Sequence, residues 1–348
     1  MKRKLFKGRK IVAAVAGAGV LFAFAGYGAG IIPGITVKTV KAAEKQDLQK
    51  LKILVPGTNS DGSGALSEVT FVADSEGYLK EELEKIGYEP EYVGFATAGV
   101  GVNEALAANE GDVAVYGDFP AITYLSNNDD ASIFAVSSSR VQIGILAKDE
   151  IKTVEDLKDK KIGTGIGTIG YKYLSDLLEK NGMSLDDVEI VNATAELPSL
   201  YAGGDIDAVA YVPTMLYKAL ESSEGHILTT NENDKDLAST FVAVGKNELL
   251  DEHPEIVTAF KNAFTEGQEF AKKNPQKVYD AMAEKSQVFG ADIYKSIYQF
   301  DESFSYWKPE LTEEVINTLQ NTADYMKKNG YIKKDITISD YVFEGAEK

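Results

Sequence analysis

Two stretches far apart in the sequence follow one pattern, and this repetition limits the possible folds more than any other feature. The first, ALAANEGDVAVYGDFP, runs from Ala105 to Pro120, and the second, SLYAGGDIDAVAYVP, runs from Ser199 to Pro213. Each contains the end of a helix, a Gly-Asp pair, an apolar strand and a closing proline. Because the sequence pattern of one structural element occurs twice, it predicts two lobes built in the same way.

The chain around these stretches alternates short strands, small-residue loops and helices. KILV at 52–55 breaks into the loop PGTNSDGSGA, and a helical pattern follows at Leu79, Leu83 and Ile86. PEYVGF, ATAGVGV and NEALAANEGD repeat the order strand, loop, helix. This order predicts an α/β fold in which each lobe is a mainly parallel sheet flanked by helices. Ligands of such sheets lie beyond the carboxyl ends of the strands, where these loops are expected.

The same pattern divides the chain into lobes. We expect lobe one to comprise residues 51–146 and 244–348, and lobe two to comprise residues 147–243. The chain then crosses between the lobes at two hinges, near Ala147 and Ala243. The C-terminal part has the apolar spacing of helices, which should pack back on lobe one.

Residues 1–42 have the composition of an export signal. Six of the first ten residues are Lys or Arg, and an apolar run from Ile11 to Ile32 follows without a charge. Cleavage after Ala42 is the favoured prediction, with a leader at 43–50. Since the apolar run is long enough to span a bilayer, an uncleaved N-terminal membrane anchor is the alternative. Both interpretations place the protein outside the cytoplasm, at the cell surface.

The mature chain is strongly acidic and contains no cysteine. Eight of the 36 basic residues and none of the 54 acidic residues lie in 1–42, which leaves 28 basic residues and a net charge of −26. Such a charge argues against binding to nucleic acid or to anionic lipid. Without cysteine, the chain forms no disulfide, no thiolate metal site and no lipid-modified cysteine.

Three glycines follow a short strand with the spacing G-x-G-x-x-G, at Gly165, Gly167 and Gly170. Thr168 is a suitable N-cap for the next helix, and backbone N–H groups at such a helix start bind anions. A dinucleotide site needs an acidic residue at the end of the following strand, where Asn192 stands instead. We therefore expect a small anionic or polar ligand here, and a plain tight turn is the alternative.

Arg140 is the only arginine after Arg9, and it follows Ser137, Ser138 and Ser139 at the end of the strand IFAV. Its guanidinium fork matches the oxygens of a carboxylate, a sulfonate or nitrate, which makes this segment a candidate ligand site. The alternative is an ion pair between Arg140 and an Asp or Glu across the lobes.

Two other loops contribute candidate ligand-binding residues. Thr97, Ala98 and Gly99 could present backbone N–H groups and a hydroxyl to an anion. Asp118 could accept a hydrogen bond from the ligand or cap the helix that follows it. Phe119 could cover an apolar ligand body.

The sequence lacks the patterns that carry common catalysis. His226 lies in a polar loop and His253 precedes Pro254, and neither has the spacing of a metal site or a catalytic triad. G-x-S-x-G, H-E-x-x-H and Walker motifs do not occur. Trp307, the single tryptophan, is expected in the core. We therefore expect a protein that is not an enzyme and that uses no cofactor and no metal.

Three segments in order resemble the substrate-binding proteins of nitrate, sulfonate and taurine ABC importers: NEALAANEGDVAVYGDFPAI, IKTVEDLKDKKIGTGIGT and LPSLYAGGDIDAVAYVP. The resemblance covers nearly the whole mature chain. It implies a two-lobed type II periplasmic-binding fold and a monomer that closes on a small oxyanion such as an aliphatic sulfonate, taurine or nitrate. It also implies delivery of the solute to an ABC permease and its ATPase.

The same resemblance implies which residues line the cleft between the lobes. In that family the loop after the first strand, which here contains Thr58, normally touches the ligand. The other residues that the resemblance places in the cleft are Thr97, Asp118, Ser137 to Arg140, Thr168 and Glu196.

Two features depart from the family pattern. The lipid-attachment cysteine is missing, and the loop PGTNSDGSGALSE is longer and more polar than expected, which leaves the identity of the solute open. Similar proteins bind thiamine-precursor pyrimidines or aromatic acids, and a cytoplasmic relative is a pyrimidine synthase with a lysine-bound cofactor. Export argues against that enzyme. A surface sensor without transport is a further alternative.

Overall fold

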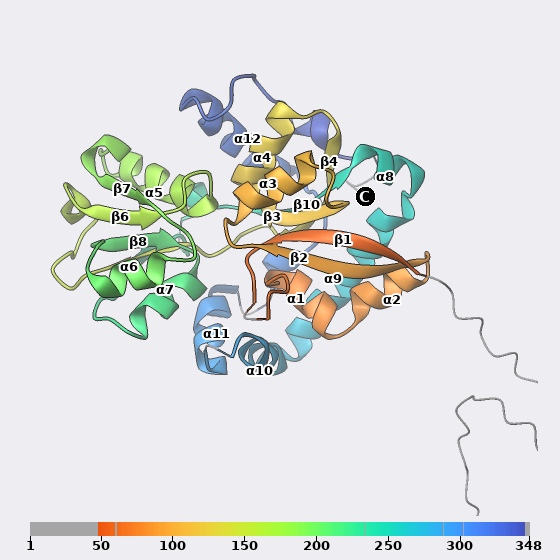
Figure 1. Ribbon diagram of the computed structural model, residues 1–348, viewed down its shortest axis with the longest axis horizontal. Coiled ribbons are helices and arrows are strands. Elements are labelled where there is room, and N and C mark those ends of the chain that lie inside the picture. Colours follow the sequence, from red (N-terminus) through yellow and green to blue (C-terminus); the bar gives the residue numbers. More distant parts are fainter. Residues whose placement is uncertain (1–47, 60, 233, 288, 302, 345–348) are drawn as a thin grey trace, which may run out of the picture. The chain divides into compact units, whose positions relative to one another are not determined.

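Two five-stranded sheets form the frame of the computed structural model, which describes residues 48–344 except 60, 233, 288 and 302 (Figure 1). The first sheet has the strand order β2-β1-β3-β10-β4 and the second has the order β7-β6-β8-β5-β9. The strands of the first sheet are β1 (Gln49–Pro56), β2 (Tyr88–Phe95), β3 (Val113–Gly117), β4 (Ala131–Ser138) and β10 (Phe241–Lys246). Those of the second sheet are β5 (Gly144–Ala147), β6 (Lys161–Thr164), β7 (Glu189–Asn192), β8 (Ala208–Tyr211) and β9 (His226–Thr230).

The two sheets have the same plan. β1 pairs in parallel with β2 and β3, and β6 pairs in parallel with β7 and β8. In each sheet one strand runs against the other four, β10 in the first and β5 in the second. β3 and β8, the strands of the two similar sequence stretches, occupy the same position. The predicted two-lobed α/β fold with mainly parallel sheets is confirmed.

The chain passes between the sheets along two segments. We call residues 139–143, between β4 and β5, the first crossing, and residues 231–240, between β9 and β10, the second crossing. The predicted hinges near Ala147 and Ala243 fall inside β5 and β10, so both crossings lie a few residues earlier than expected. Because β5 and β10 are short, apolar and almost wholly buried, the sequence shows no boundary before them.

Helices cover both faces of the first sheet (Figure 1). Three lie on one face: α1 (Glu68–Ser75), α2 (Tyr78–Glu84) and α9 (Glu255–Lys273). α3 (Gly99–Ala107) and α4 (Asp118–Asn127) lie on the other, and α12 (Glu313–Lys328) packs on α4. α9 buries Ile256, Phe260 and Phe264 at helical spacing against this layer. The expected packing of C-terminal helices on the first lobe is present.

The second sheet has α5 (Ile169–Lys180) on one face and α6 (Leu197–Gly203) and α7 (Pro213–Leu220) on the other. Under α6 and α7 lies a small separate core that includes Leu146, Leu197 and Val209. α8 (Asn247–Glu252) follows β10. α10 (Pro275–Ser286) and α11 (Ala291–Tyr298) pack on each other, and α11 also contacts α7. Single-turn 3-10 helices are η1 (Glu155–Leu157), η2 (Leu185–Asp187), η3 (Lys235–Leu237), η4 (Gln299–Asp301), η5 (Ser305–Trp307) and η6 (Ile338–Tyr341).

The predicted signal or anchor at 1–42 lies outside the described residues. The leader predicted at 43–50 ends too late, because β1 already begins at Gln49, which pairs with Tyr88. Within the described part of the chain, no helix has the length and apolarity that a membrane span requires.

Candidate functional site

The loops at the carboxyl ends of the two sheets touch each other, and we call this contact region the interlobe interface. Thr194 Oγ1, after β7, donates a hydrogen bond of 3.0 Å to the carbonyl oxygen of Ala96, after β2. Ile169, at the start of α5, packs on Gly117 at the end of β3, where a β-carbon would lie 2.5 Å from Ile169 Cγ2. The loops that were expected to hold a ligand therefore face one another.

The glycine loop enters this interface as a tight turn. Gly167 has a φ of +85°, which favours glycine, and a β-carbon there would lie 3.7 Å from Val100 of α3. Thr168 caps α5 as predicted, since its hydroxyl accepts a hydrogen bond from the backbone N–H of Tyr171. Asn192 Oδ1 accepts from the N–H of Ile166 at 2.9 Å, so this neutral side chain holds the turn from the next strand. The geometry suits the turn interpretation, and the anion role stays a prediction.

A buried carboxylate lies at the start of α1. Glu68 accepts a hydrogen bond from Trp307 Nε1 at 2.8 Å and one from the Tyr298 hydroxyl at 3.4 Å. Burial raises the pKa of Glu68 to about 7, although hydrogen bonds from Trp307, Tyr298 and Ser138 favour its charged form. We call these four residues the Glu68 cluster. Glu68 also has a left-handed φ of +54°, which is uncommon outside glycine and is concentrated at functional sites.

A small cavity lies beside this cluster at the carboxyl ends of β1 and β3. Its volume is about 10 Å³, which is room for about one water molecule. Thr70 contributes its hydroxyl to the wall and forms a 2.8 Å hydrogen bond with Ser137. The residues around the cavity are Val55, Pro56, Ala65, Leu66, Ser67, Thr70, Val115 and Phe241.

Arg140 joins the two crossings. One terminal nitrogen donates to the carbonyl oxygens of Asn231 at 2.6 Å and Glu232 at 2.8 Å, and the other donates to the Tyr306 hydroxyl at 3.2 Å. Its Nε is buried and has no partner among the described residues. The expected alternative, a carboxylate partner, is wrong for the described chain, because no Asp or Glu side chain there pairs with Arg140. A role of Arg140 in ligand binding stays a prediction.

Ser138 and Ser139 are bound within the same region as Arg140. Ser138 Oγ donates to the carbonyl oxygen of Arg140 at 3.0 Å. The backbone N–H of Ser139 donates to the carbonyl oxygen of Tyr306 at 2.7 Å, and its hydroxyl donates to the same oxygen at 3.2 Å. The serine hydroxyls thus fix the end of β4 and the first crossing.

The contacts of Asp118 and Phe119 are with the second crossing and the C-terminal part of the chain. Asp118 is fully buried and accepts hydrogen bonds from the N–H groups of Phe119 and Thr240 and from the Thr322 hydroxyl. The Phe119 ring lies edge-on to Tyr331, with ring centroids 5.2 Å apart. In the described structure, therefore, Asp118 binds the start of its own helix, as the capping alternative predicts, and Phe119 packs in the core.

The remaining candidates lie in turns, where they are exposed or half-buried except for Gly99, which is buried. Thr97, Ala98 and Gly99 form the turn into α3, in which Ala98 has a left-handed φ of +53°. Thr58 forms an isolated bridge with Gly64 inside the loop after β1. Glu196 precedes α6 and accepts from the N–H of Thr194 at 3.4 Å. The candidates thus lie at the interlobe interface, beside the Glu68 cluster, at the two crossings, in the loop after β1 and next to α12, rather than in one shell.

The sequence did not reveal Glu68 or Lys172. Ser67 followed by Glu68 and the apolar run VTFVA is a helix-start signal that could have located α1. The burial of Glu68 could not have been found this way, because its partners Tyr298 and Trp307 are far away in sequence. Lys172 resembles any lysine on a helix until α12 covers it.

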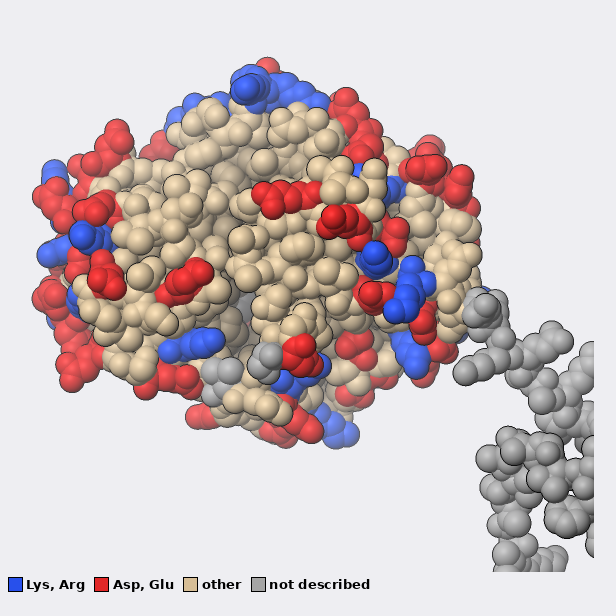
Figure 2. Space-filling view, in the orientation of Figure 1, with Lys and Arg blue, Asp and Glu red and all other residues tan. Residues whose placement is uncertain are grey.

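Charged side chains do not mark the site by themselves. On the face that Figure 2 draws, acidic side chains are spread over both parts of the protein and basic side chains lie among them. An anion that approaches this face meets a mixed, mainly acidic surface, so capture of an anion depends on local donors.

Comparisons with known proteins agree with the fold. The NMT1/THI5-like family matches residues 69–278. A protein of Brucella abortus, named only as a binding protein, is 28% identical over 282 residues, which are 79% of this chain and 86% of that protein. The taurine-binding periplasmic protein of Escherichia coli is 27% identical over 253 residues, 68% of this chain and 76% of that protein.

A solved structure has the same architecture. The alkanesulfonate-binding protein SsuA of Xanthomonas axonopodis pv. citri, bound to MOPS, superposes with a TM-score of 0.69 at 20% identity. The superposition covers 87% of this chain and 99% of that chain. With the family match over most of the chain and this shared architecture, the chain belongs to the NMT1/THI5-like family and has the periplasmic-binding-protein fold.

Proposed function

We propose that this protein is the solute-binding component of an ABC importer and works outside the cytoplasm. The protein is a monomer that captures a small oxyanion, such as an aliphatic sulfonate, taurine or nitrate, and delivers it to a permease. The binding step is closure of the two lobes about the crossings, without chemistry. The names of the relatives, which include a taurine-binding protein and an alkanesulfonate-binding protein, support this class of solute.

The contact between the two sets of loops is the observation that carries the proposal. The two crossings connect the sheets near β4 and β9, which are edge strands. The hydrogen bond from Thr194 to Ala96 connects them near β7 and β2, the strands at the other edges. A rotation about the crossings would break this contact and open the interlobe interface, while both sheets stay intact. Opening and closing around a solute is the motion that a capture protein needs.

Two helix starts supply donors for an oxyanion. α3 begins at Gly99 and α5 at Ile169, and both starts lie at the interlobe interface. Their free N–H groups and positive dipole ends favour negative charge. Thr70 and Ser137 add hydroxyls near the small cavity. These neutral donors act at short range, where the acidic charge of the rest of the chain matters least.

The Glu68 cluster favours a second candidate, a solute with N–H groups such as a thiamine-precursor pyrimidine. A carboxylate accepts hydrogen bonds and disfavours an anionic neighbour. Glu68 lies one residue from Ser67, which lines the small cavity. If the solute reaches this carboxylate, nitrogen donors would suit it better than a sulfonate.

Calorimetric titration of the full-length protein distinguishes the candidates. The panel is taurine, a short alkanesulfonate, nitrate, an aromatic carboxylate and a thiamine-precursor pyrimidine. Micromolar or tighter binding of one oxyanion would support the importer proposal and identify its solute class. Binding of the pyrimidine alone, lost in Glu68→Gln, would establish the second candidate. Binding of none would contradict both and favour a sensor role.

Gly117→Val should weaken solute binding by about tenfold or more. A β-carbon at Gly117 would lie 2.5 Å from Ile169 Cγ2, closer than real contacts allow. Overpacking costs about 1–3 kcal/mol. Here it destabilises the closed arrangement, in which the lobes touch, and therefore lowers the affinity for the solute. The measurement is the dissociation constant of the solute found in the titration above.

A matched valine keeps this test specific. Gly203→Val is the control, because Gly203 is exposed at the end of α6 and a β-carbon there meets only the flexible carboxylate of Asp205, at 3.3 Å. Equal affinities of the two variants would show that contact between Gly117 and Ile169 is not needed for binding.

A further inference from the structure

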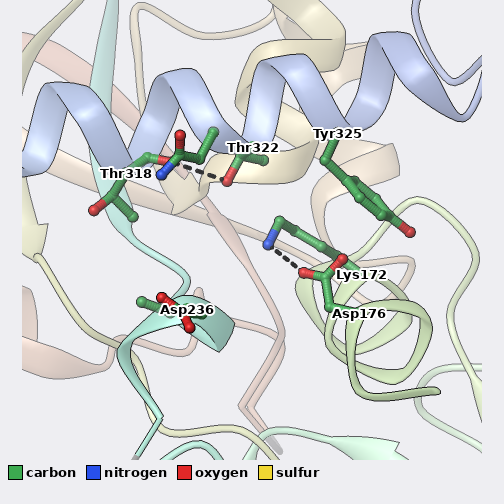
Figure 3. A pocket seen from close by; sticks show the side chains of 8 residues that line it. Lys172, Asp176, Asp236, Thr318, Thr322 and Tyr325 are labelled. Carbon is green, nitrogen blue, oxygen red and sulfur yellow. Dashed lines mark hydrogen bonds and ion pairs between the residues drawn. The ribbon is translucent and has the colours of Figure 1, made fainter. Parts of the chain in front are cut away.

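A second cavity lies between α5, α12 and the second crossing (Figure 3). Its volume is about 210 Å³, against about 10 Å³ for the small cavity beside the Glu68 cluster. Helices that cover different sheets therefore enclose one space. The cavity is lined by Lys172, Asp176, Asp236, Ala238, Thr318, Asn321, Thr322 and Tyr325.

The cavity contains a buried ammonium group. Lys172 is 5% exposed, and Figure 3 shows its side chain directed into the space below α12. Nζ donates to Asp176 Oδ2 at 2.7 Å and lies 5.6 Å from the centre of the Tyr325 ring. An ammonium has three donors, and the described residues offer Lys172 no second hydrogen-bond acceptor. The two remaining N–H groups suit an anionic oxygen in the cavity.

Acidic groups surround this ammonium. Asp176 pairs with it, Asp236 lies at the rim beside the second crossing, and Asp118 is buried nearby at the start of α4. Burial raises the pKa of Asp118, and the charge of Lys172 opposes that rise. A simple anion would meet these carboxylates, and a simple cation would meet Lys172. A molecule with one charge of each sign balances both.

We propose that this cavity is a second binding site, for a small zwitterion such as a short amino acid. The anionic group of the ligand binds the free N–H groups of Lys172, and the Thr318 hydroxyl and Asn321 amide lie within the same wall. The ligand ammonium faces Asp236, whose side chain is 91% exposed at the rim and 3.8 Å from Lys180. The volume of about 210 Å³ lies below the roughly 300–1,000 Å³ of most ligand pockets, so the cavity suits a small molecule.

The position of the cavity gives this ligand a structural effect. It would contact α5 from the second sheet, α12 from the first and Ala238 of the second crossing at the same time. Ligand binding would therefore stabilise one arrangement of the crossing. The proposal concerns a site separate from the loop contacts of the interlobe interface, and glycine and β-alanine are therefore used as its probes instead of taurine.

Titration of the full-length protein with glycine and β-alanine tests the proposal, with acetate and methylammonium as ligands of a single charge. Both zwitterions should bind at millimolar concentration or tighter, and at least about tenfold better than either single-charge ligand. Lys172→Met should weaken the zwitterions about tenfold or more by removing the ammonium. Ala238→Leu should do the same by filling the cavity while Lys172 stays in place.

Thr194→Val separates this site from the interlobe interface. It removes the hydrogen bond to Ala96 without adding bulk beside α5, and it should leave zwitterion binding unchanged. Loss of zwitterion binding in Thr194→Val would assign it to the interface and overturn the proposal. No binding to the unmodified protein, equal binding of acetate, or unchanged binding in Ala238→Leu would also overturn it. If Lys172→Met does not fold, Ala238→Leu decides the outcome.

Discussion

Arg140→Met should lower the free energy of unfolding by about 3 kcal/mol. The guanidinium of Arg140 donates three hydrogen bonds, to the carbonyl oxygens of Asn231 and Glu232 and to the Tyr306 hydroxyl. Arg140 is 7% exposed, so water replaces these bonds poorly. Hydrogen bonds to charged groups contribute about 1.5–3 kcal/mol each, and the loss is partly offset because methionine retains the apolar stem and regains side-chain freedom. Urea denaturation at fixed pH measures the difference.

Two further variants test whether the loss comes from this geometry. Arg140→Lys keeps the charge but not the planar fork, and should lose about half as much. Lys334→Met removes a cation of an exposed pair with Asp129 and should change stability by less than about 1 kcal/mol. If Arg140→Met lowered the free energy of unfolding no more than Lys334→Met does, the carbonyl groups of the second crossing would not need hydrogen bonds from the guanidinium. A simultaneous loss of solute binding in Arg140→Lys would support the ligand role predicted from the sequence.

The fold was predictable because its signals are local. A strand of apolar residues, a small-residue turn and a helix recur along the chain, and β3 and β8 of the two similar stretches occupy equivalent positions. The helix starts at Thr168 and Thr312 follow the same logic, since each threonine side chain accepts a hydrogen bond from the N–H three residues later. Such features depend on a few neighbouring residues and can be read without knowing the tertiary structure.

The crossings and the buried charges were not predictable because they depend on contacts between distant segments. The chain crosses to the other sheet just before β5 and again just before β10. Both strands are apolar like the strands before the crossings, so no change in composition marks the boundary. The carboxylate of Asp118 accepts hydrogen bonds from Thr240 and Thr322, which are far away in the sequence, so these partners could not be predicted. Its role as a ligand contact stays a prediction. Glu68 is one acidic residue among many in an acidic chain. Its environment is set by burial and by partners that are far away in the sequence, such as Tyr298 and Trp307.

The difference in free energy of unfolding between Glu68→Gln and the unmodified protein should change by about 3 kcal/mol in favour of Glu68→Gln as the pH rises from 4.5 to above 7. Burial raises the pKa of Glu68 from 4.5 to about 7 in the folded state. Between these two values the folded state binds more protons than the unfolded state, so the stability contributed by this group is present below pH 4.5 and is lost as the pH rises through 7. Each unit of pKa difference corresponds to about 1.4 kcal/mol.

The measurement is urea denaturation of both proteins from pH 4.5 to pH 8, with the difference between them plotted against pH. Other buried acids, such as Asp118 and Asp176, are present in both proteins and cancel in this difference. Glu104→Gln is the matched control, since Glu104 is exposed on α3, and its difference should stay flat. A flat difference for Glu68→Gln as well would mean that Glu68 titrates as an ordinary exposed carboxylate, and that Trp307 and Tyr298 do not enclose it in solution. A rise from pH 4.5 that levels off near pH 7 would establish a carboxyl group that changes charge close to the physiological range beside the small cavity.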